Sequence, residues 1–136
     1  MQLNPYLNFD GQCKQAFEFY QQLLGGEVVM MTFGESPMAD QISTEEQGRI
    51  MHACLTLGDK MLMGSDMPPG ACYQKAQGIH VTLGIDDTAE AERVFDALAD
   101  NGTLLMPFEE TFFAHGFGMA TDRFGTPWMV ICAKAC

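Results

Sequence analysis

The residues best suited to chemistry are a histidine and two glutamates in one short stretch. His115 follows Glu109 and Glu110 and stands among phenylalanines and glycines, in a segment that we expect to be a loop. An imidazole beside a carboxylate can transfer protons near neutral pH, so the stretch predicts an acid/base pair of His115 and Glu110. A loop histidine held by backbone groups would explain the same pattern.

Two further histidines are candidates for the same chemistry. His80 is expected in a pocket wall or in the core, with its ring satisfied by hydrogen bonds; the alternative is an acid/base or ligand-binding role. His52 opens a predicted strand and has no carboxylate nearby in the sequence, so we expect a structural group.

The cysteines argue against two kinds of site. Their number is odd and no CxxC pair occurs, so neither a disulfide framework nor a thiolate zinc site is predicted. No Ser-His-Asp order, HExxH motif or activated-cysteine motif is present, and nucleophilic catalysis is therefore unsupported. The five cysteines are Cys13, Cys54, Cys72, Cys132 and Cys136.

Charge excludes two classes of partner. The 136 residues carry 7 Lys and Arg against 18 Asp and Glu, a formal net charge of -11, which repels phosphate backbones and anionic lipids. No apolar run approaches the ~20 residues of a bilayer span, and the N-terminus lacks a signal peptide pattern. We expect a cytoplasmic protein that binds neither nucleic acid nor membranes.

The elements that would position these residues occur in the same order twice. Hydrophobic spacing and turn residues predict strand, helix, strand and then a β-hairpin in each half. The first strand and helix of the two halves align with a shift of 75 residues, and the hairpin glycines Gly58 and Gly125 with a shift of 67. The first set is a strand at 3–9, a helix beginning near Cys13 and ending at Gly25, a strand at 27–33, a loop at 34–48 and a hairpin at 49–63. The second is a strand at 79–85, a helix begun by Asp87, a strand at 103–107, a loop at 108–116 and a hairpin at 117–133.

This order predicts an α+β fold of two βαβββ modules within one domain, 1–136. Module one covers about 1–66, a Pro- and Gly-rich connection about 67–78, and module two about 79–136. Each helix covers one face of its sheet, so we expect the two mixed sheets to be paired around a shared cleft.

Four stretches of the sequence are distinctive: Pro5-Tyr6-Leu7-Asn8-Phe9, Met63-Gly64-Ser65-Asp66, the stretch from Glu110 to Gly118, and Asp122-Arg123-Phe124-Gly125-Thr126-Pro127-Trp128-Met129. They resemble motifs of the vicinal oxygen chelate superfamily, the glyoxalase/bleomycin resistance/dihydroxybiphenyl dioxygenase-like proteins. The match is closest to the PhnB-like branch, which has also been labelled 3-demethylubiquinone-9 3-methyltransferase-like. Nothing in the chain resembles a Gly-rich S-adenosylmethionine loop, because Gly116-Phe117-Gly118 leads into a predicted strand.

The resemblance implies a divalent metal held by residues on the first and last strands of each module. The corresponding positions are Pro5 and His80 on the first strands, and Leu62 (or Met63 if the register slips) and Met129 on the last strands. Only His80 offers a donor for a hard cation, and one imidazole would bind such an ion too weakly. We therefore predict no metal site and no cofactor at these positions.

The leading hypothesis is a binding protein for a small apolar or amphipathic molecule, with Pro5, Leu62, Met63, His80 and Met129 lining the cleft. The alternative is a lyase, isomerase or dioxygenase-like enzyme. It would use a relocated metal site, or metal-free acid/base catalysis by His80, His115 and Glu110. The resemblance also implies a homodimer, which is compatible with either function.

Overall fold

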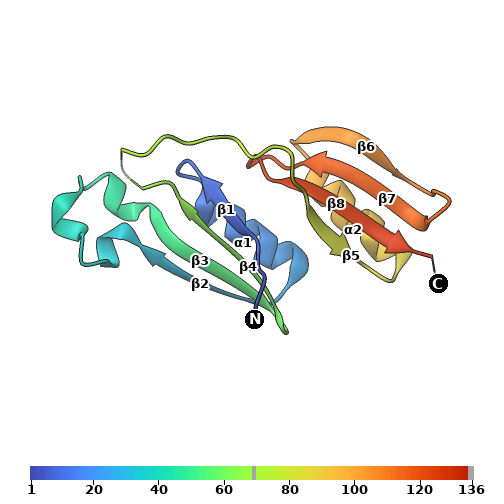
Figure 1. Ribbon diagram of the computed structural model, residues 1–136, viewed down its shortest axis with the longest axis horizontal. Coiled ribbons are helices and arrows are strands. Elements are labelled where there is room, and N and C mark those ends of the chain that lie inside the picture. Colours follow the sequence, from blue (N-terminus) through green and yellow to red (C-terminus); the bar gives the residue numbers. More distant parts are fainter. Residues whose placement is uncertain (69, 135–136) are drawn as a thin grey trace. The chain divides into compact units, whose positions relative to one another are not determined.

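The computed structural model describes residues 1–68 and 70–134, which form two compact units, residues 1–74 and 75–136. Pro69 of the predicted connection, and Ala135 and Cys136 at the end of module two, lie outside the described residues. Each unit contains one helix and one four-stranded mixed sheet (Figure 1). The predicted α+β fold of two βαβββ modules is confirmed.

The sheet of the first unit has the strand order β1-β4-β3-β2. Strand β1 pairs with β4 in parallel, while β4 with β3 and β3 with β2 are antiparallel. Three 3-10 turns, η1 (Phe33–Glu35), η2 (Ala39–Gln41) and η3 (Glu46–Gly48), occupy the segment predicted to be a loop. The strands are β1 (Tyr6–Phe9), β2 (Glu27–Thr32), β3 (Ile50–Leu57) and β4 (Lys60–Asp66).

Helix α1 (Cys13–Leu24) covers one face of this sheet because its apolar residues recur at helical spacing. Cys13, Ala16, Phe17 and Tyr20 are all buried. The helix ends at Gly25, whose φ of 82° is a conformation that favours glycine. Gly64 of β4 lies beneath it, and a Cβ there would stand 2.9 Å from the Phe17 ring.

The second unit repeats this arrangement with the strand order β5-β8-β7-β6. Helix α2 (Thr88–Ala99) begins at Asp87, whose carboxylate accepts a hydrogen bond from the Glu90 N–H at 2.9 Å. Its buried face includes Phe95, which packs over Gly118. The strands are β5 (Val81–Gly84), β6 (Thr103–Glu109), β7 (Ala114–Thr121) and β8 (Pro127–Ala133).

Several strand boundaries differ by two or three residues from the sequence prediction, and two of them have a clear physical reason. Strand β1 begins at Tyr6 rather than residue 3, since Pro5 has no N–H to donate to a ladder. The predicted loop 108–116 is a short turn, because the Thr111 hydroxyl accepts hydrogen bonds from the N–H groups of Phe113 and Ala114. Strand β7 therefore begins at Ala114. Within residues 1–68 and 70–134, no helix is long and apolar enough to cross a bilayer.

Candidate functional site: the helix-free faces of the two sheets

The face of the first sheet that lies opposite α1 is largely apolar. Cα partners across paired strands point to the same side of a sheet, so the registers assign the side chains to faces. Val29 is 72% exposed and Met31 44%, while Met61 and Met63 are half-buried. We call this surface the N-terminal apolar face; it comprises Tyr6, Val29, Met31, His52, Cys54, Met61 and Met63.

The second sheet has a corresponding surface opposite α2. Met119 pairs with both Met106 and Met129, so three methionines cross three adjacent strands. The aliphatic and aromatic side chains of Ile131 and Phe117 extend the row along the strands. We call this surface the C-terminal apolar face; it comprises Met106, Phe117, Met119, Met129 and Ile131.

One polar pair stands on the N-terminal apolar face. The Tyr6 hydroxyl lies 3.2 Å from Nδ1 of His52, and the two rings are stacked with centroids 5.8 Å apart. His52 is thus a hydrogen-bonded histidine, but its partner is a phenol from another strand. Leu7 and Phe9 are buried, and side chains alternate between the two faces of a strand. This alternation in the sequence is the signal that predicts Tyr6 on the helix-free face.

The structure separates two of the residues predicted to line a cleft. Leu62 is 6% exposed and pairs with the fully buried Leu55, so Leu62 lies on the helix-covered face. Met63, the next residue, lies on the opposite face. The predicted cleft position on the last strand of this unit is therefore Met63 and not Leu62. Pro5 precedes β1, and its carbonyl accepts a hydrogen bond from the Met63 N–H at 3.2 Å.

The predicted acid/base residues are not brought together. His115 is an exposed residue of β7 rather than of a loop, which corrects its predicted placement. Glu110 forms an ion pair with Lys134 at 3.2 Å. In the described part of the chain no hydrogen bond or ion pair joins His115 to Glu109 or Glu110. His80 is half-buried, and its Nε2 atom is buried without a hydrogen-bond partner among the described residues.

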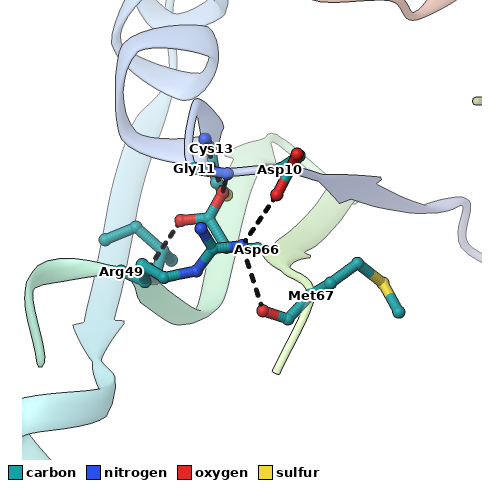
Figure 2. Close-up of polar contacts among 7 residues, drawn as sticks. Asp10, Gly11, Cys13, Arg49, Asp66 and Met67 are labelled. Carbon is teal, nitrogen blue, oxygen red and sulfur yellow. Dashed lines mark hydrogen bonds and ion pairs between the residues drawn. The ribbon is translucent and has the colours of Figure 1, made fainter. Parts of the chain in front are cut away.

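A buried carboxylate that sequence reasoning missed organises one end of the first unit (Figure 2). Asp66, 1% exposed, accepts hydrogen bonds from the N–H groups of Gly11 at 2.8 Å, Cys13 at 3.1 Å and Ile50 at 2.8 Å. It therefore joins the end of β4 to the start of α1 and the start of β3. The Met63-Gly64-Ser65-Asp66 motif has a structural explanation here.

Arg49 forms further hydrogen bonds at the same end of the first unit. Its Nη2 atom donates to Asp10 Oδ1 at 3.3 Å and to the Met67 carbonyl at 3.2 Å (Figure 2). This arginine therefore ties the segment after β1 to the segment after β4.

A second buried carboxylate, Asp122, has the same kind of role in the other unit. Its Oδ1 atom accepts hydrogen bonds from the N–H groups of Phe124 and Thr126, both at 2.9 Å, and its Oδ2 atom accepts one from Trp128 Nε1 at 2.8 Å. These contacts shape the turn between β7 and β8. The Asp122-Arg123-Phe124-Gly125 motif is thus a turn built around one carboxylate.

Cys13 is the cysteine nearest to a helix start, yet its environment opposes thiolate formation. The residue is fully buried, and burial together with the nearby Asp66 charge raises the pKa of its thiol to about 12. A nucleophilic cysteine requires the opposite shift of pKa. Cys13 is therefore a packing residue.

The side chains on the helix-free faces do not fit the hard divalent cation that the resemblance implies. Where the first and last strands of each unit pair, the Cα partner of Tyr6 is Met63 and that of Thr82 is Met129. A phenol, a hydroxyl and two thioethers lack the imidazole and carboxylate donors that such an ion requires. Among residues 1–68 and 70–134, no three His, Cys, Asp or Glu residues gather where they could hold a metal.

Comparison with known proteins gives full-length matches. Residues 1–131 match the protein family described as 3-demethylubiquinone-9 3-methyltransferase. Protein YjdN of Escherichia coli is 40% identical over 145 residues, covering 98% of this chain and 97% of the relative. Protein PA1353 from Pseudomonas aeruginosa is similar in structure, with 45% identity, a TM-score of 0.91 and 99% coverage of both chains.

Solved structures of lower sequence identity have a similar fold. A Bacillus cereus structure described as a putative 3-demethylubiquinone-9 3-methyltransferase, PhnB protein, is 26% identical, with a TM-score of 0.71 and coverage of 96% of this chain and 98% of that chain. At 14% identity, a glyoxalase-related enzyme from Fulvimarina pelagi has a TM-score of 0.63 and coverage of 96% and 88%, which shows the fold alone. The chain therefore belongs to the 3-demethylubiquinone-9 3-methyltransferase family, and it has the fold of a glyoxalase-related protein.

Proposed function

We propose that the protein binds a small apolar or amphipathic molecule on its helix-free faces without a hard divalent metal. The observation that carries this proposal is the composition of the two apolar faces. Each presents thioether, aliphatic and aromatic side chains near its centre, whereas charged residues of the same registers, such as Glu27 and Glu109, stand on edge strands.

Methionine makes such a surface adaptable. Its unbranched thioether side chain rearranges at little cost, so a methionine-rich surface accommodates ligands of varied outline. The Tyr6–His52 pair supplies a polar group beside the apolar surface and would fix the orientation of an amphipathic ligand.

The methyltransferase activity in the family description is not part of this proposal. S-adenosylmethionine is commonly held by a Gly-rich loop between a strand and a helix of a doubly wound parallel sheet. Here Gly116-Phe117-Gly118 lies inside β7, and each sheet has four strands with a single parallel pairing.

A neutral naphthylamine fluorophore tests the proposal directly. We expect saturable, stoichiometric binding that weakens by at least about tenfold when Met63→Glu or Met129→Glu places a charge on either face. The matched control is Met38→Glu, since Met38 is 50% exposed and is the N-cap residue of η2, outside the strands. Binding that is unsaturable, or equally weakened by the control, would contradict the proposal.

We also propose that the protein acts in the cytoplasm as a homodimer. A net charge of -11 disfavours association with membranes, and a contiguous exposed apolar stretch on β6 offers a surface for a second copy. That stretch is Leu104, Leu105 and Met106, which are 56%, 52% and 46% exposed. Light scattering coupled to size exclusion tests this: Leu105→Glu should shift the protein from dimer to monomer, and a wild-type monomer would refute the assembly.

A further inference from the structure

Four soft metal donors occupy adjacent positions at the centre of the N-terminal apolar face. His52 and Cys54 stand two residues apart on β3, an inner strand of the sheet. The Cα partner of Cys54 on β4 is Met63, and the Cα partner of His52 on β2 is Met31. The register therefore places one imidazole, one thiol and two thioethers on one patch of one face.

We propose that this patch binds one Cu(I) ion through Cys54, Met63 and His52, with Met31 as the fourth donor. Cross-strand partners have Cβ atoms ~5 Å apart and diagonal neighbours ~7 Å, distances that flexible thioethers bridge. Thiolate and thioether ligands select Cu(I), and imidazole also suits copper, whereas Mn²⁺ favours carboxylate and carbonyl oxygens. Two thioethers in the set of four favour Cu(I) over Zn²⁺, whose usual ligands are thiolate, imidazole and carboxylate. Met63, whose thioether does not suit a hard cation, thus suits a soft one.

The Tyr6–His52 contact orients the imidazole for this role. With Nδ1 protonated, the ring donates a hydrogen bond to the Tyr6 hydroxyl oxygen at 3.2 Å, and the lone pair of Nε2 is left for a metal. Stacking of the two rings further limits rotation of the imidazole. Tyr6 is therefore a positioning residue in the proposed site.

The state of Cys54 is also suitable. It is a free, half-buried cysteine whose Sγ atom lies 3.8 Å from the Thr56 hydroxyl. Coordination deprotonates the thiol and releases one proton to solvent, so the bound thiolate neutralises the single positive charge of Cu(I). No change in the oxidation state of the metal or the protein is involved. The site does not depend on the small-molecule function proposed above.

Competition with a chromophoric Cu(I) chelator under anaerobic, reducing conditions tests the site on the full chain. We expect one equivalent of Cu(I) to be withdrawn from the chelator, with affinity falling at least about a hundredfold in Cys54→Ser and about tenfold in Met63→Leu. The matched controls are Cys72→Ser, which removes an exposed cysteine of the connection, and Met119→Leu on the other sheet. Circular dichroism checks that each variant folds.

Methionine-methyl NMR gives a second readout, because Cu(I) has a filled d shell and does not broaden spectra. We expect the methyl resonances of Met63 and Met31 to shift on addition of one equivalent, while those of Met119 and Met129 stay in place. The proposal is overturned if the chelator keeps all the copper, if Cys72→Ser weakens binding as much as Cys54→Ser, or if all methionines shift alike.

Discussion

The carboxylate of Asp66 accepts a hydrogen bond at 3.1 Å from the backbone N–H of Cys13, a residue 53 positions earlier. This contact places an acceptor at the first turn of α1, whose N-cap residue, Gln12, makes no side-chain capping hydrogen bond. The end of the last strand thus supplies the cap that the local sequence lacks. The negative charge also interacts favourably with the positive end of the helix dipole.

Loss of this acceptor should strongly destabilise the first unit. Asp66→Ala leaves the N–H groups of Gly11, Cys13 and Ile50 without their partner, so we expect a loss of about 3–5 kcal/mol in the free energy of unfolding. Asp66→Asn retains one acceptor oxygen and should cost less. Urea denaturation measures both, with Asp59→Ala, whose side chain is 88% exposed, as the control. Equal midpoints for Asp66→Ala and Asp59→Ala would show that the buried carboxylate adds no stability.

The raised pKa of Cys13 predicts a dependence of stability on alkaline pH. The unfolded thiol ionises near its ordinary pKa of 9.0, but the folded thiol ionises only near a pKa of about 12. The folded state therefore holds its proton more tightly, and stability is fully present below pH 9 and falls between pH 9 and 12. Cys13→Ala should flatten this part of the stability curve, as followed by urea midpoints at several pH values. A slope unchanged in Cys13→Ala would assign it to other groups.

The same burial predicts the reactivity of the four described cysteines. At pH 8 a disulfide-exchange reagent should modify the exposed Cys72 first, and Cys13 should react only when the chain unfolds. Mass spectrometry of the modified peptides distinguishes the positions. Early modification of Cys13 in the native protein would contradict the packing described here.

Two glycines of the second sheet form a matched pair. A Cβ on Gly118 would lie 2.6 Å from the Phe95 ring, whereas a Cβ on Gly84 would meet no atom within 4 Å. We expect Gly118→Ala to cost about 1–3 kcal/mol by forcing α2 away from β7, and Gly84→Ala to change stability little. Thermal unfolding measures both variants. A Gly118→Ala protein as stable as Gly84→Ala would mean that α2 does not pack closely on this strand.

The Tyr6–His52 contact predicts a specific effect of removing one oxygen atom. Tyr6→Phe keeps the ring stacked near His52 but removes the group that lies 3.2 Å from Nδ1. The tautomer ratio of His52 should change, which ¹⁵N NMR of the imidazole nitrogens reports. His115, on the other unit, is the internal control, and a matching change there would rule out a local effect.

The arrangement of elements was predictable because it depends on local periodicity. Cys13, Ala16, Phe17 and Tyr20 repeat at helical spacing, and Gly25 marks the end of α1 as Asp87 marks the start of α2. The hairpin that turns at Gly58 follows from one glycine between two apolar strands. Each of these signals spans only a few residues of sequence.

The candidate site was harder to predict because it depends on register between distant strands. A shift of one residue moves a side chain to the other face of a sheet, and the sequence therefore predicts Leu62 where Met63 lies on the apolar face. Tyr6 and His52 are 46 residues apart, so no local pattern joins them. Asp66 and Asp122 occur in motifs that carry the family resemblance, yet their hydrogen bonds became visible only in the structure.

Each unit brings its first strand beside its last, β1 with β4 and β5 with β8. During synthesis on the ribosome, α1 emerges long before the strand whose carboxylate caps it, so a nascent chain that ends before β4 should remain unfolded. We expect the sheet to close only once β4 is complete, because β4 pairs with both β1 and β3. Because all strand pairings lie within one unit, duplication of the gene segment that encodes a unit adds a whole sheet. Such a duplication breaks no existing strand pairing.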